Sequence, residues 1–268
     1  MTNEKKLSKT TLVFFAVIIV LCVASLLSYL FLDQAVYSIL EQSPVSWQEN
    51  SFVTYFTLLG KAWLPIWLLL FWALAAKQFK PAFIGIFSLI IIIISVSSIK
   101  LITQRSRPRD VTKASTWQDN TPPILRSWSF PSGDAAAVFA VSAAITPFVA
   151  WPWIPVLFAA SSGVALFRVT SFAHYPSDVL AGAALGIFAG LLAQQIIRRW
   201  RDFDKILPQH LRFLSFIAII AIPISIGLSK GLNFLLTFLA TYGVLAVTVY
   251  IISKITARLK HSGSQNET

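Results

Sequence analysis

Three residues that could do chemistry lie close together between two apolar stretches, in the segment FRVTSFAHYPSD: a fixed cation, Arg168, and two groups that can take up or release a proton, His174 and Asp178. Charged groups at a bilayer boundary are costly unless they are solvated, paired or used in function. Pro176 predicts the start of a helix, which places Asp178 in the first turn, where its carboxylate reaches back to His174. Such a contact orients the imidazole and fixes which ring nitrogen is free. Taken alone, a passive hydrogen-bonding histidine and a helix-capping aspartate explain the segment as well.

A second basic cluster precedes it, in the segment KLITQRSRP, where Lys100 and Arg107 are seven residues apart. On a helix this spacing puts both side chains on one face, although Pro108 favours an extended conformation for Arg107. One interpretation is that the two cations bind an anion. The alternative is an interfacial pair that extends toward lipid phosphates.

A third candidate is the small polar turn SFPSGD, which leads directly into an apolar helix. Pro131 suits the first helical position, and the backbone N–H groups of Ser132 and Gly133 then favour an anion at the helix N-terminus. Ordinary capping explains the same residues: Ser129 or Ser132 accepts a backbone N–H, and Asp134 complements the helix dipole.

The elements that position these clusters are membrane helices. The chain has 268 residues, of which 56% are hydrophobic and 12% charged, which excludes an ordinary soluble domain. Because a spanning helix needs about 20 apolar residues, the sequence predicts an all-α bundle of about eight spans. They cover residues 10–32, 52–76, 81–102, 134–151, 154–173, 177–197, 212–229 and 233–253.

Lysine and arginine collect in four segments that fall on one side of the bilayer if the eight helices alternate: 1–9, 77–80, 198–205 and 254–260. The positive-inside rule makes this side, with both termini, cytoplasmic. The loop at 34–50, with Glu41 and Glu49 and without basic residues, suits the outer side. The loop at 103–133 breaks the pattern, since it is outside and basic, and we expect it to bind an anion. All three clusters then lie on the outer face.

Together the clusters offer three cations, helix N-terminal amides and an oriented histidine, which suits a tetrahedral dianion and a covalent phosphohistidine. One histidine and scattered carboxylates do not have metal-ligand spacing, so the chemistry is expected to need no metal. The net charge of +11 follows the positive-inside pattern, with anionic lipids as partners and no nucleic-acid role. A single cysteine, Cys22, supports neither a disulfide nor a metal framework.

The three motifs resemble the signature of the type 2 phosphatidic acid phosphatase (PAP2) superfamily, which reads KxxxxxxRP, then PSGH, then SRxxxxxHxxxD. Here they read KLITQRSRP, PSGD and FRVTSFAHYPSD, between residues 100 and 178. The resemblance implies a six-helix core over residues 10–198 within a single membrane domain, 1–268. The helical hairpin at 212–253 is an addition to that core.

Carried over position by position, the resemblance implies that His174 attacks phosphorus, that Asp178 orients it, and that water then hydrolyses the phosphohistidine. No cofactor is implied. The residues implied to hold the phosphate are Lys100, Arg107, Ser132, Gly133 and Arg168.

Two positions depart from the signature: Phe167 replaces a serine, and Asp134 replaces the histidine that protonates the leaving group in the family. An ordinary aspartate, with a pKa of about 3.9, is ionised at neutral pH. Either Asp134 is protonated when substrate binds and still acts as general acid, or it only caps its helix or pairs with a cation. The substitution favours diphosphate substrates, whose leaving group needs less proton assistance, or an acidic working pH.

The resulting prediction is a cell (inner) membrane phosphatase for lipid phosphates at the extracytoplasmic face. Family substrates include undecaprenyl diphosphate, phosphatidylglycerol phosphate, phosphatidic acid and phosphorylated lipid A, and the sequence does not separate them. Lys61 is a further head-group candidate, or a lysine that extends to the membrane surface. Two alternatives stay open: a phosphotransferase that uses a second lipid as acceptor, and a non-catalytic protein that binds or translocates lipid phosphates. The oligomeric state is left open.

Overall fold

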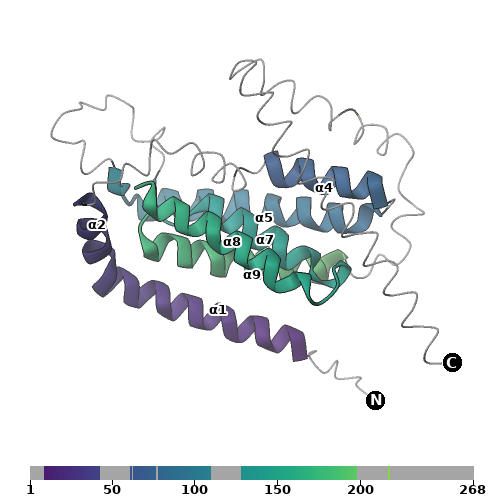
Figure 1. The fold of residues 1–268 in the computed structure, drawn as a ribbon, viewed down its shortest axis with the longest axis horizontal. Helices are drawn as coiled ribbons and strands as arrows, with labels where there is room; N and C mark the ends of the chain where they lie inside the picture. Colours follow the sequence, from purple (N-terminus) through teal and green to yellow (C-terminus); the bar gives the residue numbers. More distant parts are fainter. Residues whose placement is uncertain are drawn as a thin grey trace.

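A computed structural model of the chain describes residues 9–42, 61, 63–76, 78–109, 128–197 and 217. These residues form a bundle of helices that run roughly along one direction (Figure 1). No strand occurs in these ranges, so the predicted all-α class is confirmed for them. The predicted spans at 212–229 and 233–253 lie outside the described residues apart from residue 217.

The helices agree with the predicted apolar segments to within a few residues at most ends. Within the described residues, four helical stretches are long and apolar enough to cross a membrane: Thr11–Glu41, Phe79–Thr103, Trp153–Thr170 and Pro176–Ile197. The protein is therefore a membrane protein. The helices are α1 (Lys9–Leu27), α2 (Asp33–Glu41), α4 (Trp63–Ala76), α5 (Phe79–Thr103), α7 (Gly133–Ile145), α8 (Trp153–Thr170) and α9 (Pro176–Ile197), with a π-helical turn η1 (Ser28–Leu32) and a 3-10 turn η4 (Thr146–Phe148).

The first helix is longer than predicted. We expected a loop from residue 34, but α2 continues the helix to Glu41 after the π-helical turn. At this turn the chain bends, so that α2 points away from the direction of α1 (Figure 1). π-Helical turns of this kind are a known cause of sharp helix bends. The Ser28 hydroxyl donates to Oδ1 of Asp33 at 3.0 Å across the bend.

Helices α7 and α9 pack backbone against backbone at the centre of the bundle. A Cβ atom added to Gly182, Gly186 or Gly190 would lie within 2.4 to 2.5 Å of a carbonyl oxygen of α7 or of its N-cap residue. Glycines four residues apart form one stripe on α9, the small-residue pattern that lets membrane helices approach closely. This contact fixes the N-terminus of α7 against the first turn of α9.

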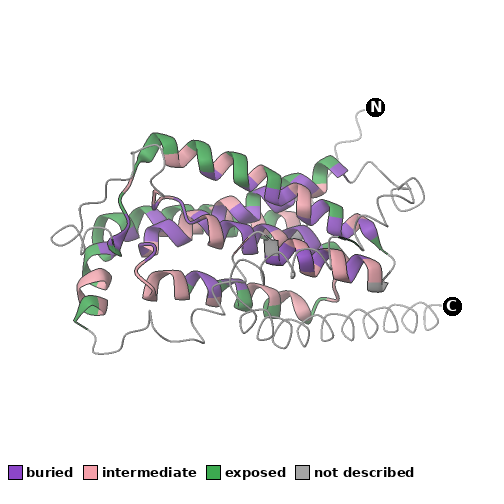
Figure 2. Ribbon diagram, turned by 90° about the horizontal axis from the view of Figure 1, so that it is seen from above, coloured by how far each residue is buried: buried purple, intermediate pink, exposed green. Residues whose placement is uncertain are grey.

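The burial pattern fits this arrangement. In Figure 2 the central helices are largely buried, whereas α1 exposes much of its surface. The exposed residues of α1 are mostly large and apolar, among them Leu12, Val13, Ile19 and Val20. A large apolar surface along a long helix is unfavourable in water, so this face suits contact with lipid.

Candidate functional site

Four chain segments meet at one end of the bundle: the C-terminal ends of α5 and α8 and the N-terminal ends of α7 and α9. His174 lies in the short turn that joins α8 to α9, and only 2% of its surface is exposed. Its backbone N–H donates to the carbonyl of Arg168 at 3.1 Å, as does that of Ala173 at 3.2 Å. These two bonds give the carbonyl of Arg168, at the C-terminal end of α8, its hydrogen-bond partners, and they fix the backbone of His174.

Helix α9 begins at Pro176, as predicted, and Asp178 is its third residue. The carboxylate Oδ2 accepts the backbone N–H of Tyr175 at 2.8 Å, half of a capping box. The same oxygen lies 3.6 Å from Nδ1 of His174, which is longer than a hydrogen bond. The Ser129 hydroxyl donates to this oxygen and lies 3.5 Å from Nδ1. The structure thus brings His174 and Asp178 together, with Ser129 beside both.

Burial lowers the pKa of His174 from 6.5 to about 4. The contact with Asp178 raises this pKa, and the positive charges of Arg107 and Arg168 lower it. The imidazole is therefore neutral at physiological pH. A neutral imidazole has a free ring nitrogen with which it can act as a nucleophile.

The N-terminus of α7 differs from the prediction in two respects. The helix begins at Gly133 and Ser132 is its N-cap, so Pro131 precedes the helix instead of occupying its first position. Ser132 Oγ accepts the N–H of Ala135 at 3.4 Å, whereas its own N–H donates to the carbonyl of Asp178 at 2.9 Å. The amide of Ser132 is thus already used within the fold. Gly133 opens the helix, where backbone N–H groups have no acceptor within the helix.

The three cations predicted from the sequence lie at this end of the bundle. Arg107, 7% exposed, donates from Nη1 to the carbonyl of Ala173 at 3.3 Å. Lys100 donates from Nζ to the carbonyl of Trp128 and interacts electrostatically with Arg107 and Arg168. Arg107 lies beyond the end of α5, which agrees with the expectation that Pro108 keeps it out of a helix, so the two residues do not share a helix face. The chain turns after Thr103, with Gln104 in a left-handed conformation (φ 45°), and Arg107 then bonds to the turn between α8 and α9.

Arg168 occupies the last turn of α8. Its Nε lies 3.1 Å from Oδ2 of Asp134, an ion-pair distance. This Nε is buried, and its N–H is not aligned for a hydrogen bond with any acceptor in the described ranges. The Asp134 carboxylate balances the charge of the guanidinium as an ion pair, and a bound anion would share this cation with it. We call Lys100, Arg107 and Arg168, with the N-terminus of α7, the phosphate site, after the ligand that the sequence analysis predicts for them.

Asp134 also pairs with a residue far away in the sequence. Nζ of Lys61 lies 3.0 Å from Oδ2 of Asp134. Lys61 lies two residues before the start of α4 at Trp63. Of the two alternatives for Asp134, pairing with a cation is the one seen in this structure. Lys61 is thus an ion-pair partner of Asp134, and 42% of its side chain is exposed.

Two charged residues of the site were not among the predicted site residues: Arg105, which belongs to the basic loop at 103–133, and Asp33. Arg105 bonds to Asp178 and to Asp33, which is 2% exposed at the start of α2. The available signal was an aspartate at the end of an apolar segment, because ionisable residues in membrane segments are usually functional.

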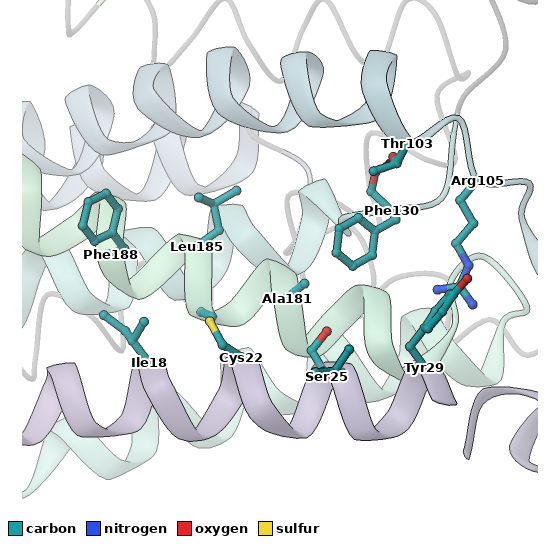
Figure 3. Close-up of a pocket in the computed structure, with 12 residues that line it drawn as sticks. Ile18, Cys22, Ser25, Tyr29, Thr103, Arg105, Phe130, Ala181, Leu185 and Phe188 are labelled. Carbon is teal, nitrogen blue, oxygen red and sulfur yellow. Dashed lines mark hydrogen bonds between the residues drawn. The ribbon is translucent and has the colours of Figure 1, made fainter. Parts of the chain in front are cut away.

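Two apolar grooves adjoin the site. The first, of about 220 Å³, lies between α4, α7 and α8 and includes Leu68, Val138, Ser142 and Ala160. Val138 is one helical turn beyond Asp134, so this groove begins next to the phosphate site. The second, of about 730 Å³, is bounded by α1, α9 and the end of α5 (Figure 3). Arg105 and Tyr29 lie at its polar end.

Among the described residues there is no group of three or more His, Cys, Asp or Glu side chains placed to hold a metal ion. Cys22 is a free, exposed thiol on α1.

Comparison with known proteins identifies one family. The model of the PAP2 superfamily matches residues 81–202, which include α5 from its third residue, all of α7, α8 and α9, and every residue of the three motifs. No curated protein and no solved structure matches the chain.

Proposed function

Because residues 81–202 belong to the PAP2 superfamily, whose members are generally phosphatases, we propose that this protein hydrolyses lipid phosphates or diphosphates through a phosphohistidine intermediate. The observation that carries the proposal is a buried, neutral His174 beside Asp178, next to three cations and the N-terminus of a helix. This arrangement supplies a nucleophile, an orienting carboxylate and positive charge, which are the main needs of phosphoryl transfer.

In the proposed reaction, Lys100, Arg107 and Arg168 bind the phosphate oxygens, and the amide of Gly133 adds a hydrogen bond. Nε2 of His174 attacks phosphorus as the bond from phosphorus to the leaving oxygen breaks, with the electron pair going to that oxygen. Asp178 stabilises the imidazolium character that develops. Water then attacks phosphorus, the bond to Nε2 breaks, and inorganic phosphate leaves.

The contacts of Asp134 bear on the leaving group. Its carboxylate is 3.0 Å from Lys61 and 3.1 Å from Arg168, and both cations favour the ionised form. An ionised carboxylate cannot donate a proton to an alkoxide. We therefore propose a preference for diphosphates, whose leaving group is itself a stable anion.

The groove between α4, α7 and α8 supports a lipid substrate. It is apolar and begins one turn from Asp134, at the side where the leaving group would lie. A hydrocarbon chain attached to the leaving group can follow this groove while the phosphate stays at the end of the bundle. Burial of apolar chain surface would contribute about 25 cal/mol per Å².

We place the site at the extracytoplasmic face of the cell (inner) membrane, with both termini cytoplasmic, on the strength of the basic segments at 1–9, 77–80, 198–205 and 254–260. Single cysteines introduced at Ser171 and at Lys80 in a Cys22→Ser protein test this orientation. A membrane-impermeant thiol reagent added to intact cells should label the first position and not the second. The opposite pattern would reverse the proposed topology.

The function is tested by release of inorganic phosphate from a lipid monophosphate and a lipid diphosphate by the detergent-purified protein. Wild type should turn over, and His174→Ala should lose activity by at least about 10²-fold. EDTA should leave the rate unchanged, since the cations of the site belong to the chain. Phosphate release only after addition of a second lipid would favour the phosphotransferase, and binding without release would favour the non-catalytic protein.

A further inference from the structure

Arg105 connects two buried carboxylates that belong to different helices. Nη1 donates to Oδ1 of Asp178 at 2.7 Å, and Nη2 donates to Oδ2 of Asp33 at 2.6 Å. Asp178 is 0% exposed and Asp33 is 2% exposed. Two buried negative charges are costly unless they are paired and hydrogen-bonded, so one guanidinium stabilises both.

Aromatic rings hold the guanidinium in place. Its central carbon lies 4.0 Å from the ring centroid of Tyr175 and 5.0 Å from that of Tyr29, within the range of cation–π interactions. Figure 3 shows the Arg105 side chain reaching from the segment after α5 to the ring of Tyr29. Lysine has neither the planar group nor the paired donors for this position.

Asp33 in turn is fixed by the first turn of α9. Its Oδ1 accepts the backbone N–H of Ser177 at 3.0 Å, and its Oδ2 accepts the Ser177 hydroxyl at 2.5 Å. The N–H of Ser177 belongs to the helix start, where backbone donors lack partners within the helix. Asp33 therefore caps α9 from another helix, next to Asp178.

The two oxygens of Asp178 have different neighbours. Oδ2 lies on the side of His174 and accepts from Ser129 and from the N–H of Tyr175, whereas Oδ1 accepts from Arg105. A carboxylate held at both oxygens has a fixed plane. That plane determines how Oδ2 faces Nδ1 of His174.

We propose that Arg105 and Asp33 are positioning residues for phosphoryl transfer: Arg105 sets the orientation of the Asp178 carboxylate toward His174, and Asp33 holds Arg105. The inference rests on the proposed function. In this proposal, two residues outside the phosphate site affect the reaction. Through Asp33, the bend between α1 and α2 contributes to the geometry of His174 and Asp178.

The first test is the kinetics of Arg105→Gln and of Lys80→Gln, a control that removes one positive charge near the opposite end of α5. Arg105→Gln should lower kcat by about 10- to 100-fold, the cost of a misplaced catalytic group. KM and inhibition by inorganic phosphate should change by no more than about twofold, because the phosphate site is intact. Lys80→Gln should match wild type in both respects.

A double-mutant cycle with Asp178→Asn separates positioning from general structural support. If Arg105 acts through Asp178, the double variant should have the same kcat as Asp178→Asn alone. Arg105→Lys should recover only part of the lost rate. Independent, multiplicative losses, or a loss of phosphate inhibition parallel to the loss of rate, would overturn the inference.

Folding is monitored by the elution volume in detergent and by thermal unfolding. If Arg105→Gln does not fold, Asp33→Asn is judged by the same criteria: reduced kcat with unchanged phosphate inhibition supports the inference, and unchanged kcat refutes it. The outcome is distinct from failure of the function itself. An inactive wild type, or a His174→Ala variant as active as wild type, rejects the phosphatase, whereas an active wild type with an unaffected Arg105→Gln variant rejects only the positioning role.

Discussion

Oδ2 of Asp134 lies 3.0 Å from Nζ of Lys61, although 73 residues separate the two in the chain. The pair links the start of α4 to the first turn of α7 at the edge of the phosphate site. Together with Arg168, Lys61 makes Asp134 part of an ion-pair group instead of a free acid.

This relationship predicts how the leaving group affects the rate. Wild type should cleave a lipid diphosphate faster than a monophosphate with the same chain, by about 10-fold or more, because Asp134 gives no proton assistance. Asp134→His should raise the rate of monophosphate cleavage and so reduce the ratio of the diphosphate rate to the monophosphate rate. Asp134→Asn should leave the rate of diphosphate cleavage within a few-fold of wild type. Parallel measurements of phosphate release from both lipids, with wild type and both variants, test this prediction. A large loss of diphosphate cleavage in Asp134→Asn would instead identify Asp134 as the general acid.

The pKa of His174, lowered by burial to about 4, predicts an unusually acid-tolerant nucleophile. Protonation removes the nucleophilic lone pair, so a lowered pKa moves the acid limit of kcat/KM to lower pH. Activity should persist as pH falls through 6.5 and decline only near pH 4. The second ionisation of a phosphate monoester substrate lies near pH 6, so a profile of rate against pH would contain that ionisation as well. The pKa of His174 is therefore best measured directly. NMR titration of the chain's three labelled histidines, with His174→Ala to identify the signal, should find one that stays neutral to about pH 4; a value near 6.5 would contradict the buried site.

The groove beside Asp134 predicts a selective effect on substrates with long chains. Ala160 lines this groove on α8, whereas its neighbour Ala159 does not, and both are exposed. Ala160→Phe should raise KM for a long-chain lipid phosphate by about 10-fold, the effect of losing about 1.4 kcal/mol of binding. A short-chain substrate should be unaffected. Ala159→Phe is the matched control, and equal effects of the two variants would argue that the chain lies elsewhere.

The contact between α7 and α9 predicts a sharp difference between two glycine variants. A Cβ at position 186 would lie 2.4 Å from the carbonyl oxygen of Ala136, whereas one at position 85 meets the flexible end of Leu69 at 2.6 Å. Gly186→Ala should therefore lower stability by about 1–3 kcal/mol, the usual cost of overpacking. Gly85→Ala should cost less, since a side chain can move aside. Thermal unfolding in detergent compares them, and equal melting temperatures would show that α9 can shift at little cost.

The sequence predicted the helical class, the approximate bounds of the described spans and the segments that form the site. Hydrophobic length and helix-start signals are local, which is why Pro176 and Asp178 were placed correctly. The error at residues 34–41 arose because the helix continues through a π-helical turn and beyond the polar residue Asp33. Counting consecutive apolar residues does not detect such a continuation. The contacts of Lys61 and of Asp33 are long-range in sequence, and pattern analysis of one chain contains no information on such partners.

The glycine stripe on α9 also determines where a ligand can reach the site. The turn with His174 and the N-terminus of α7 are joined by the close backbone contact between α7 and α9, which fixes their positions relative to each other. Because the two backbones touch along this stripe, no hydrocarbon chain fits between α7 and α9. A lipid that reaches the proposed site from the bilayer would therefore have to enter between other helices, without separating the two that carry His174, Asp178 and Gly133.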